Sequence, residues 1–202
     1  MSVLRWYLLA GLLVHKLVWE VLKSRGLAAP PEAKKSLAIR LVKAVKLAIL
    51  AGIVVQVLLP TVLPIMDDPA SLSFAGTLLF TAGLSLALAA RFELGRNWSD
   101  IEAGIVQANH TVVETGVYRY IRHPIYVGDL ALLVGLELAL NSWLVIPAIL
   151  LIPLILYKAI GEEAVVQKSL PGYEAYCQRT SRFLPLRFER KLVARSSVRS
   201  ER

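Results

Sequence analysis

The sequence predicts an all-α, polytopic membrane protein with about five transmembrane helices, the last two of them a tight helical hairpin, followed by a cytosolic C-terminal helical segment. Of its 202 residues, 56% are hydrophobic, and the mean hydropathy is +0.58. A single soluble core of this size cannot bury so much apolar surface, so a bilayer must solvate part of it. The apolar residues also gather in long runs, which charged segments separate.

The first two predicted spans lie on either side of a strongly basic segment. Val3 to Leu22 is long enough to cross a bilayer at about 1.5 Å of rise per residue. Lys23 to Lys46 is rich in Lys and Arg, and the positive-inside rule places it in the cytosol. Leu47 to Ile65 is the second span, which Pro60 and Pro64 are expected to distort or end.

The third span and the hairpin complete the predicted membrane region. Leu72 to Ala90 is the third span, after which the chain re-enters the cytosol. Tyr126 to Leu140 and Trp143 to Tyr157 are each short for a full crossing, and Asn141-Ser142 between them favours a hinge. We therefore expect a hairpin that returns the chain to the cytosol, with an external N-terminus and a cytosolic C-terminus.

The whole chain, residues 1–202, is predicted to form one integral membrane domain. Residues 1–94 would hold the first three spans, and residues 95–185 would combine polar segments with the last two helices. Residues 186–202 read as a basic tail. The sequence shows no internal repeat that would divide it further.

Charge, cysteine content and motifs exclude several classes of protein. The formal net charge is +8, but the basic residues lie between apolar runs, where anionic lipid accounts for them, so no nucleic-acid partner is expected. The one cysteine, Cys177, excludes an internal disulfide and a cysteine-based metal cluster. His15 has no companion at metal-ligand spacing, so no metal site is predicted. The chain also lacks the glycine-rich GxGxxG motif of soluble Rossmann-type methyltransferases.

Polar clusters gather on the predicted cytosolic side of the membrane. They are Arg122-His123-Pro124-Ile125-Tyr126-Val127-Gly128 before the hairpin, Glu162-Glu163 after it, and then Gly172-Tyr173-Glu174-Ala175-Tyr176 and Arg182-Phe183-Leu184-Pro185. A purely structural interpretation is open: Pro suits a first helical turn, Arg, His and Tyr anchor helices at interfaces, and paired carboxylates often face solvent. Because His110 and Tyr118 fall on the same side, a functional site is the favoured interpretation.

In order and spacing, these segments resemble the isoprenylcysteine carboxyl methyltransferase family of integral membrane enzymes, from roughly Ala89 to Pro185. The resemblance implies S-adenosylmethionine as the methyl donor and S-adenosylhomocysteine as the product. It implies as acceptor the C-terminal carboxylate of an isoprenylated cysteine, whose lipid tail enters from the bilayer. The active site of such an enzyme would face the cytosol.

The resemblance also implies cofactor contacts for particular residues. They are His110, Thr111, Val112, Val113, Tyr118, His123, Pro124, Ile125, Tyr126 and Glu163, together with Gln107, whose distance from His110 differs from the family's pattern. The chemistry suits that cofactor, because a sulfonium is a soft cation that aromatic faces attract. No chemistry is assigned to Tyr173, Tyr176 or Arg182 to Pro185, which are expected to pack the C-terminal helix against the membrane domain.

The acceptor is expected to meet Lys158 and Glu162, which share a helix face at i,i+4 spacing. The family has an Arg and a Glu at these positions, proposed to contact the substrate. Lys keeps the charge but lacks the bidentate fork of Arg, so Arg122 is an alternative partner for the acceptor's carboxylate. An ionised carboxylate needs no strong general base, so catalysis would consist mainly of alignment.

Other functions stay open on the sequence alone. Phospholipid N-methyltransferases and NADPH-dependent sterol reductases resemble the same superfamily pattern. A reductase would be expected to have a longer chain and extra basic residues for a 2′-phosphate. A membrane scaffold without enzymatic activity would bind no cofactor.

Overall fold

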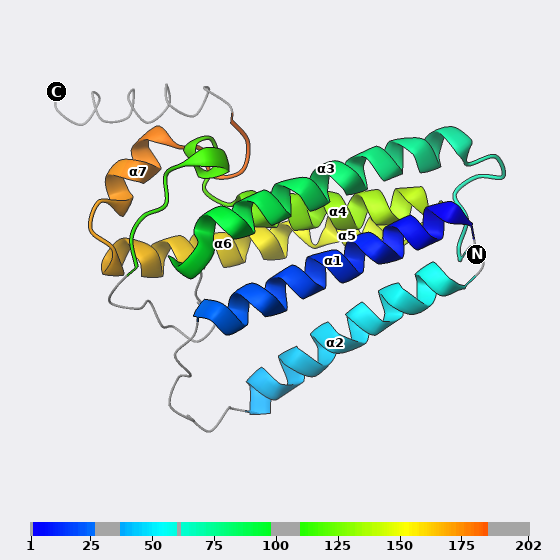
Figure 1. The fold of residues 1–202 in the computed structure, drawn as a ribbon, viewed down its shortest axis with the longest axis horizontal. Coiled ribbons are helices and arrows are strands. Elements are labelled where there is room, and N and C mark those ends of the chain that lie inside the picture. The colour runs from blue at the N-terminus through cyan, green and yellow to red at the C-terminus, as the bar shows by residue number, and fades with distance from the viewer. Residues whose placement is uncertain (1, 27–36, 60–61, 98–109, 186–202) are drawn as a thin grey trace.

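The computed structural model describes residues 2–26, 37–59, 62–97 and 110–185, and the regular elements in these ranges are all helical (Figure 1). The α-helices are α1 (Val3–Gly26), α2 (Leu37–Leu58), α3 (Ala70–Leu94), α4 (Pro124–Ala139), α5 (Val145–Leu150), α6 (Ile152–Ser169) and α7 (Tyr173–Arg179), and the 3-10 turns are η1 (Gly95–Asn97) and η3 (Gly116–Arg119). The predicted all-α class is confirmed for these residues. The number of membrane crossings stays a prediction.

The long helices form an elongated bundle in which α3 lies against α4 and α1, and α2 lies along the outer side of α1 (Figure 1). The short helix α7 and the turn η3 gather at one end, opposite the N-terminus. The fully buried side chains of Leu8, Val57, Phe80 and Leu136 connect α1, α2, α3 and α4 in one apolar core.

Helices α3 and α4 approach each other backbone to backbone along their length. The glycines at this contact are Gly76 and Gly83 of α3 and Gly128 and Gly135 of α4. A Cβ atom added at Gly83 would lie 2.3 Å from the backbone nitrogen of Leu132, far closer than side chains tolerate. Small residues permit such close packing between helices, and this contact holds the start of α4 against the end of α3.

Polar contacts fasten α2 at the end of the bundle that carries the N-terminus. Arg5 of α1 donates hydrogen bonds to the last carbonyl groups of α2, at 2.8 Å from the oxygen of Val57. Gln56 of α2 donates to the buried carboxyl group of Glu137 in α4 at 2.7 Å. The bonds from Arg5 satisfy carbonyl groups at the end of α2, which have no partner within the helix. The bond from Gln56 ties α2 to α4.

Two helical stretches in the described part of the chain are long and apolar enough to cross a membrane. They are Ala70–Leu94, which is α3, and Val145–Ser169, which comprises α5 and α6, each with a hydropathy of 1.8. Large apolar side chains on their outer surfaces are exposed, among them Phe74, Leu78 and Leu154.

The observed helix boundaries differ from the predicted spans where proline and turn residues act. Helix α2 covers Leu37–Leu58, so this helix both begins and ends earlier than the span predicted from Leu47 to Ile65. The stretch from Trp143 to Tyr157 is divided at Leu151, because Pro153 in the first turn of α6 cannot donate a helical hydrogen bond. The predicted turn is present, with Asn141 at φ 54°.

Candidate functional site

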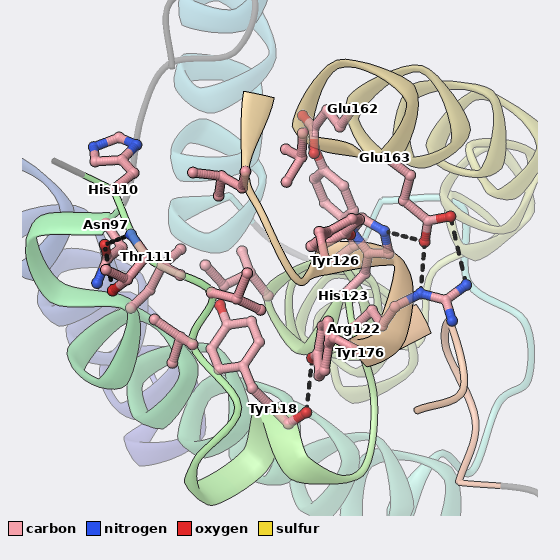
Figure 2. A pocket seen from close by; sticks show the side chains of 17 residues that line it. Asn97, His110, Thr111, Tyr118, Arg122, His123, Tyr126, Glu162, Glu163 and Tyr176 are labelled. Carbon is pink, nitrogen blue, oxygen red and sulfur yellow. Dashed lines mark hydrogen bonds and ion pairs between the residues drawn. The ribbon is translucent and has the colours of Figure 1, made fainter. Parts of the chain in front are cut away.

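A cavity of about 180 Å³ lies at the end of the bundle where α4, α6 and α7 meet the segment from residue 110 to residue 123 (Figure 2). Predicted site residues at its wall are His110, Thr111, Val112, Val113, Tyr118, Arg122, His123, Ile125, Tyr126, Glu162 and Glu163. The wall also contains residues that were not predicted to belong to the site: Leu94, Asn97, Val166, Leu170, Tyr173 and Tyr176. Segments far apart in the chain therefore converge on one cavity.

Two predicted site residues that the structure describes, Pro124 and Lys158, lie away from the wall. Pro124 is buried in the first turn of α4, where its ring suits the start of a helix. Lys158 lies on α6 beside the wall, with its ammonium 5.6 Å from the centre of the Tyr126 ring and 4.0 Å from the Glu162 carboxylate. Gln107 lies outside the described residues.

The start of α4 presents two rings to the cavity. His123 is the residue before the first helical turn, and Tyr126 follows within that turn. The two rings stack with centres 5.5 Å apart and planes inclined by 14°. On α6, Glu162 accepts a hydrogen bond from the Tyr126 hydroxyl, which joins α4 to α6 across the cavity (Figure 2).

Glu163 turns toward a cluster of positively charged and imidazole groups. Its carboxylate accepts hydrogen bonds from Arg122 Nε and His123 Nε2, each at 2.9 Å, and from Arg182 Nη2 at 2.9 Å. The carboxylate is buried, and the two guanidinium groups and the imidazole beside it supply the hydrogen bonds that an ionised carboxylate requires away from solvent.

The guanidinium of Arg122 is engaged on every nitrogen. Nε and Nη2 face Glu163, and Nη1 donates to the carbonyl oxygens of Cys177, at 2.9 Å, and Thr180. This geometry favours a positioning role for Arg122 over the predicted contact with an acceptor carboxylate. It equally favours a positioning role for Glu163 over the predicted contact with a cofactor.

The opposite wall carries a polar corner at the end of α3. Asn97 Oδ1 accepts a hydrogen bond from the backbone N–H of Thr111 at 2.8 Å. The neighbouring His110 has its Nε2 atom buried without a hydrogen-bond partner in the described part of the protein. Because buried polar atoms are nearly always paired, this nitrogen fits a site whose ligand supplies the missing partner.

Tyrosines supply much of the remaining wall. The hydroxyl of Tyr176 donates to the backbone oxygen of Tyr118 at 2.7 Å, which joins α7 to η3. Burial raises the pKa of the phenols of Tyr118, Tyr173 and Tyr176, so all three stay protonated and uncharged near neutral pH. The wall thus offers neutral aromatic faces, which attract a cation without contributing a negative charge.

One polar contact away from the cavity was not foreseen. His15 of α1 lies 2.9 Å from the Asp129 carboxylate of α4, and its ring stacks on Trp19 with centres 4.2 Å apart. In the described ranges, no group of three or more His, Cys, Asp or Glu side chains could hold a metal ion. The contact joins α1 to α4, the helix that follows His123.

Comparison with known proteins relates the cavity region to methyltransferases. The family model for phospholipid methyltransferases matches residues 72–171, which run from α3 to the end of α6. A protein-S-isoprenylcysteine O-methyltransferase of Schizosaccharomyces pombe is 27% identical over 110 residues, which are 52% of this chain and 45% of that protein. The human protein of the same name is 40% identical over 57 residues, 28% of this chain and 20% of its own length.

A third relative carries a different name. The cobalt-zinc-cadmium resistance protein CzcN of Cupriavidus metallidurans is 30% identical over 116 residues, 56% of this chain and 52% of that protein. The chain thus spans about half the length, or less, of the curated relatives that it matches. The matches confirm the expected resemblance: residues 72–171 match the family model for phospholipid methyltransferases, and parts of the chain are similar to two protein-S-isoprenylcysteine O-methyltransferases.

Proposed function

We propose that the protein is an integral membrane methyltransferase that transfers a methyl group from S-adenosylmethionine to the C-terminal carboxylate of an isoprenylated cysteine. The observation that carries the proposal is a cavity with tyrosine faces and a buried histidine nitrogen that has no partner among the described residues, built largely by the region that matches methyltransferases. The exposed apolar surface of α3, α5 and α6 supports a membrane location, with the lipid tail of the acceptor approaching from the bilayer.

The residues at the wall suit the proposed cofactor. When bound, S-adenosylmethionine supplies a methyl group on a positively charged sulfur, which a nucleophile can displace. The rings of Tyr118 and Tyr126 offer faces for that positive charge. The Nε2 atom of His110 has no hydrogen-bond partner among the described residues and could bond to the cofactor. Thr111 is the next residue along the cavity wall.

On the acceptor side, Lys158 and Glu162 are the proposed contacts. With Arg122 held by Glu163, Lys158 is the cation that we assign to the acceptor's carboxylate. Its side chain is 39% exposed beside the cavity, so it can approach a bound group. The acceptor oxygen is already ionised, so the C–O bond forms as the S–C bond breaks and no proton has to move. The contribution of the protein is therefore alignment.

A second candidate is N-methylation of a phospholipid amine. Two observations favour it: the description of the matching family, and the carboxylate of Glu162 at the cavity wall, which would suit an ammonium group. Such an acceptor would have to lose a proton before it could attack the methyl group.

A labelling assay separates the two reactions. Membranes containing the protein are incubated with methyl-labelled S-adenosylmethionine and either a farnesylated cysteine analogue or phosphatidylethanolamine. We expect label in the farnesylated acceptor, released as methanol by mild alkali, because a carboxyl ester is base-labile. Alkali-stable label in the lipid would support the second candidate instead, and no transfer to either acceptor would contradict both.

A further inference from the structure

The segment from Thr180 to Phe183 is attached to the cavity wall through its backbone. The N–H of Arg122 donates to the carbonyl of Ser181 at 2.9 Å, and the N–H of His123 donates to the carbonyl of Arg182 at 3.1 Å. These bonds pair the C-terminal segment with the residues that immediately precede α4. The segment also lies beyond residues 72–171, which the family model matches.

Glu163 connects this segment to α6. Its Oε1 atom accepts from Arg122 Nε and His123 Nε2, its Oε2 atom accepts from Arg182 Nη2 and Arg122 Nη2, and Arg182 Nε lies within hydrogen-bond distance of both oxygens (Figure 2 shows the contacts to Arg122 and His123). The Glu163 side chain is 10% exposed, so solvent adds little to its hydrogen bonding. Three donors from two segments therefore meet at one buried carboxylate, with Arg182 as the donor from the C-terminal segment.

These contacts determine the state of the His123 ring. An ionised carboxylate can only accept hydrogen bonds, so the Nε2 atom that faces Glu163 must carry a proton. The ring also stacks on Phe183, with centres 5.5 Å apart, as it does on Tyr126. The orientation of His123 thus depends on α6 and on the C-terminal segment as well as on α4.

We propose that Glu163 and Arg182 are positioning residues: Arg182 holds the C-terminal segment on Glu163, and Glu163 fixes the protonated Nε2 edge of His123 for the methyl donor. This inference rests on the proposed function for the role of the donor, whereas the effect on His123 is independent of it. The segment from Thr180 to Phe183 then belongs to the site as a structural part of its wall. Neither residue touches the reacting atoms.

Arg182→Ala is the suitable variant because it leaves no buried charge alone. Arg182 is 35% exposed, and without it Glu163 still pairs with Arg122 and His123. Arg179→Ala is the matched control. Arg179 precedes the same segment and forms an ion pair with Glu114, but the pair is exposed on the surface, outside the Glu163 cluster.

The experiment measures two properties of the full chain in detergent. Calorimetric titration gives the affinity for S-adenosylmethionine, and ¹⁵N nuclear magnetic resonance of histidine-labelled protein reports which nitrogen of His123 is protonated, with His123→Gln used to assign the signal. We expect Arg182→Ala to weaken cofactor binding at least tenfold and to shift the His123 ring signal, because the segment that stacks Phe183 on this ring and accepts the His123 N–H is then held less firmly. Arg182→Lys should fall between this variant and the wild type, since it keeps the charge without the fork. Arg179→Ala should stay within twofold in affinity with an unchanged signal.

The inference is overturned if the His123 signal of Arg182→Ala matches that of the wild type, whatever the affinity, because the arginine would then have only a general structural role. It is also overturned if Arg179→Ala has the same effects as Arg182→Ala. A wild-type chain that binds no S-adenosylmethionine would contradict the proposed function, while the resonance comparison would still decide the effect on His123.

Discussion

Glu162 and Glu163 are neighbours in the sequence with different surroundings. Successive residues of a helix point about 100° apart, so the two carboxylates of α6 face different partners. Glu163 faces the cluster of Arg122, His123 and Arg182, whereas Glu162 meets the Tyr126 hydroxyl and Lys158. The contacts of Glu163 suit a residue that holds the cavity wall together. Those of Glu162 suit a residue that orients a bound acceptor.

Glu162→Gln should therefore reduce turnover more than cofactor binding. A misaligned acceptor loses part of the proximity contribution, and we expect the rate at saturating cofactor to fall about tenfold or more, ~1.4 kcal/mol. The affinity for S-adenosylmethionine should change less than twofold. Rates come from the labelling assay and affinities from calorimetric titration, with Glu174→Gln on the exposed face of α7 as the control. Full turnover in Glu162→Gln would remove this residue from the acceptor site.

Site residues close to a local signal could be predicted from the sequence, and those that depend on distant contacts could not. His123 and Tyr126 flank Pro124, which marks the start of a helix in the sequence itself. Asn97 gave no comparable signal, because its role comes from the return of Thr111 to the end of α3. The engagement of Arg122 was likewise invisible, since its partners lie on α6 and around α7.

Among the elements, α3 and α4 form the most constrained pair. Their close contact depends on glycine at positions where any side chain would meet backbone atoms. Such a contact gains van der Waals attraction and needs no polar groups, which suits an apolar surrounding. It was not predicted, since glycine in an apolar run does not show which helix it faces.

Gly83→Ala should destabilise the fold, whereas Gly52→Ala should not. The added methyl at Gly83 would meet the backbone of α4, with an expected cost of about 1–3 kcal/mol for overpacking. Nothing lies within 4 Å of a Cβ added at Gly52 of α2, so alanine there should be neutral or stabilise by up to about 1 kcal/mol through helix propensity. Thermal unfolding in detergent, followed by circular dichroism, compares the two. Equal midpoints would show that α3 and α4 can separate at little cost.

The last apolar stretch of the membrane region is divided into two helices, and the sequence contains the residue that divides it. The sequence predicts Trp143 to Tyr157 as the second helix of a tight hairpin, but Pro153 separates α5 from α6, and α6 then continues to Ser169. Proline was expected to distort or end the second span, and the same effect of Pro153 was not predicted. By contrast, the turn at Asn141 was placed correctly because its residue type favours positive φ.

At the scale of the whole molecule, the described residues form an apolar bundle with a cavity near one end whose wall combines aromatic, apolar and charged side chains. This distribution is compatible with the predicted orientation, in which the basic segment from Lys23 to Lys46 and the cavity share the cytosolic side. The C-terminal part of this basic segment belongs to α2, which begins at Leu37, and the orientation is tested in membranes.

Cysteine labelling in intact cells provides that test. Single cysteines at Lys35, Asp68 and Ser197 are introduced in a Cys177→Ser background and treated with a reagent that does not cross membranes. We expect labelling at position 68 from outside, and at positions 35 and 197 only after the membrane is permeabilised. Labelling at positions 35 and 197 but not at position 68 in intact cells would show that the orientation is opposite to the predicted one.

The backbone contact between α3 and α4 also limits how the cavity can widen. Leu94 is the last residue of α3 and Ile125 lies in the first turn of α4, and both line the cavity. A slide of one helix past the other by one turn, about 5.4 Å, would bring side chains against backbone where glycines now meet it. Helix α6 meets the start of α4 through side chains instead, Glu162 on Tyr126 and Glu163 on Arg122 and His123, and such contacts can break and re-form without a clash between backbones. We therefore expect a bulky ligand to enter by displacing α6 and α7, while α3 and α4 keep their register.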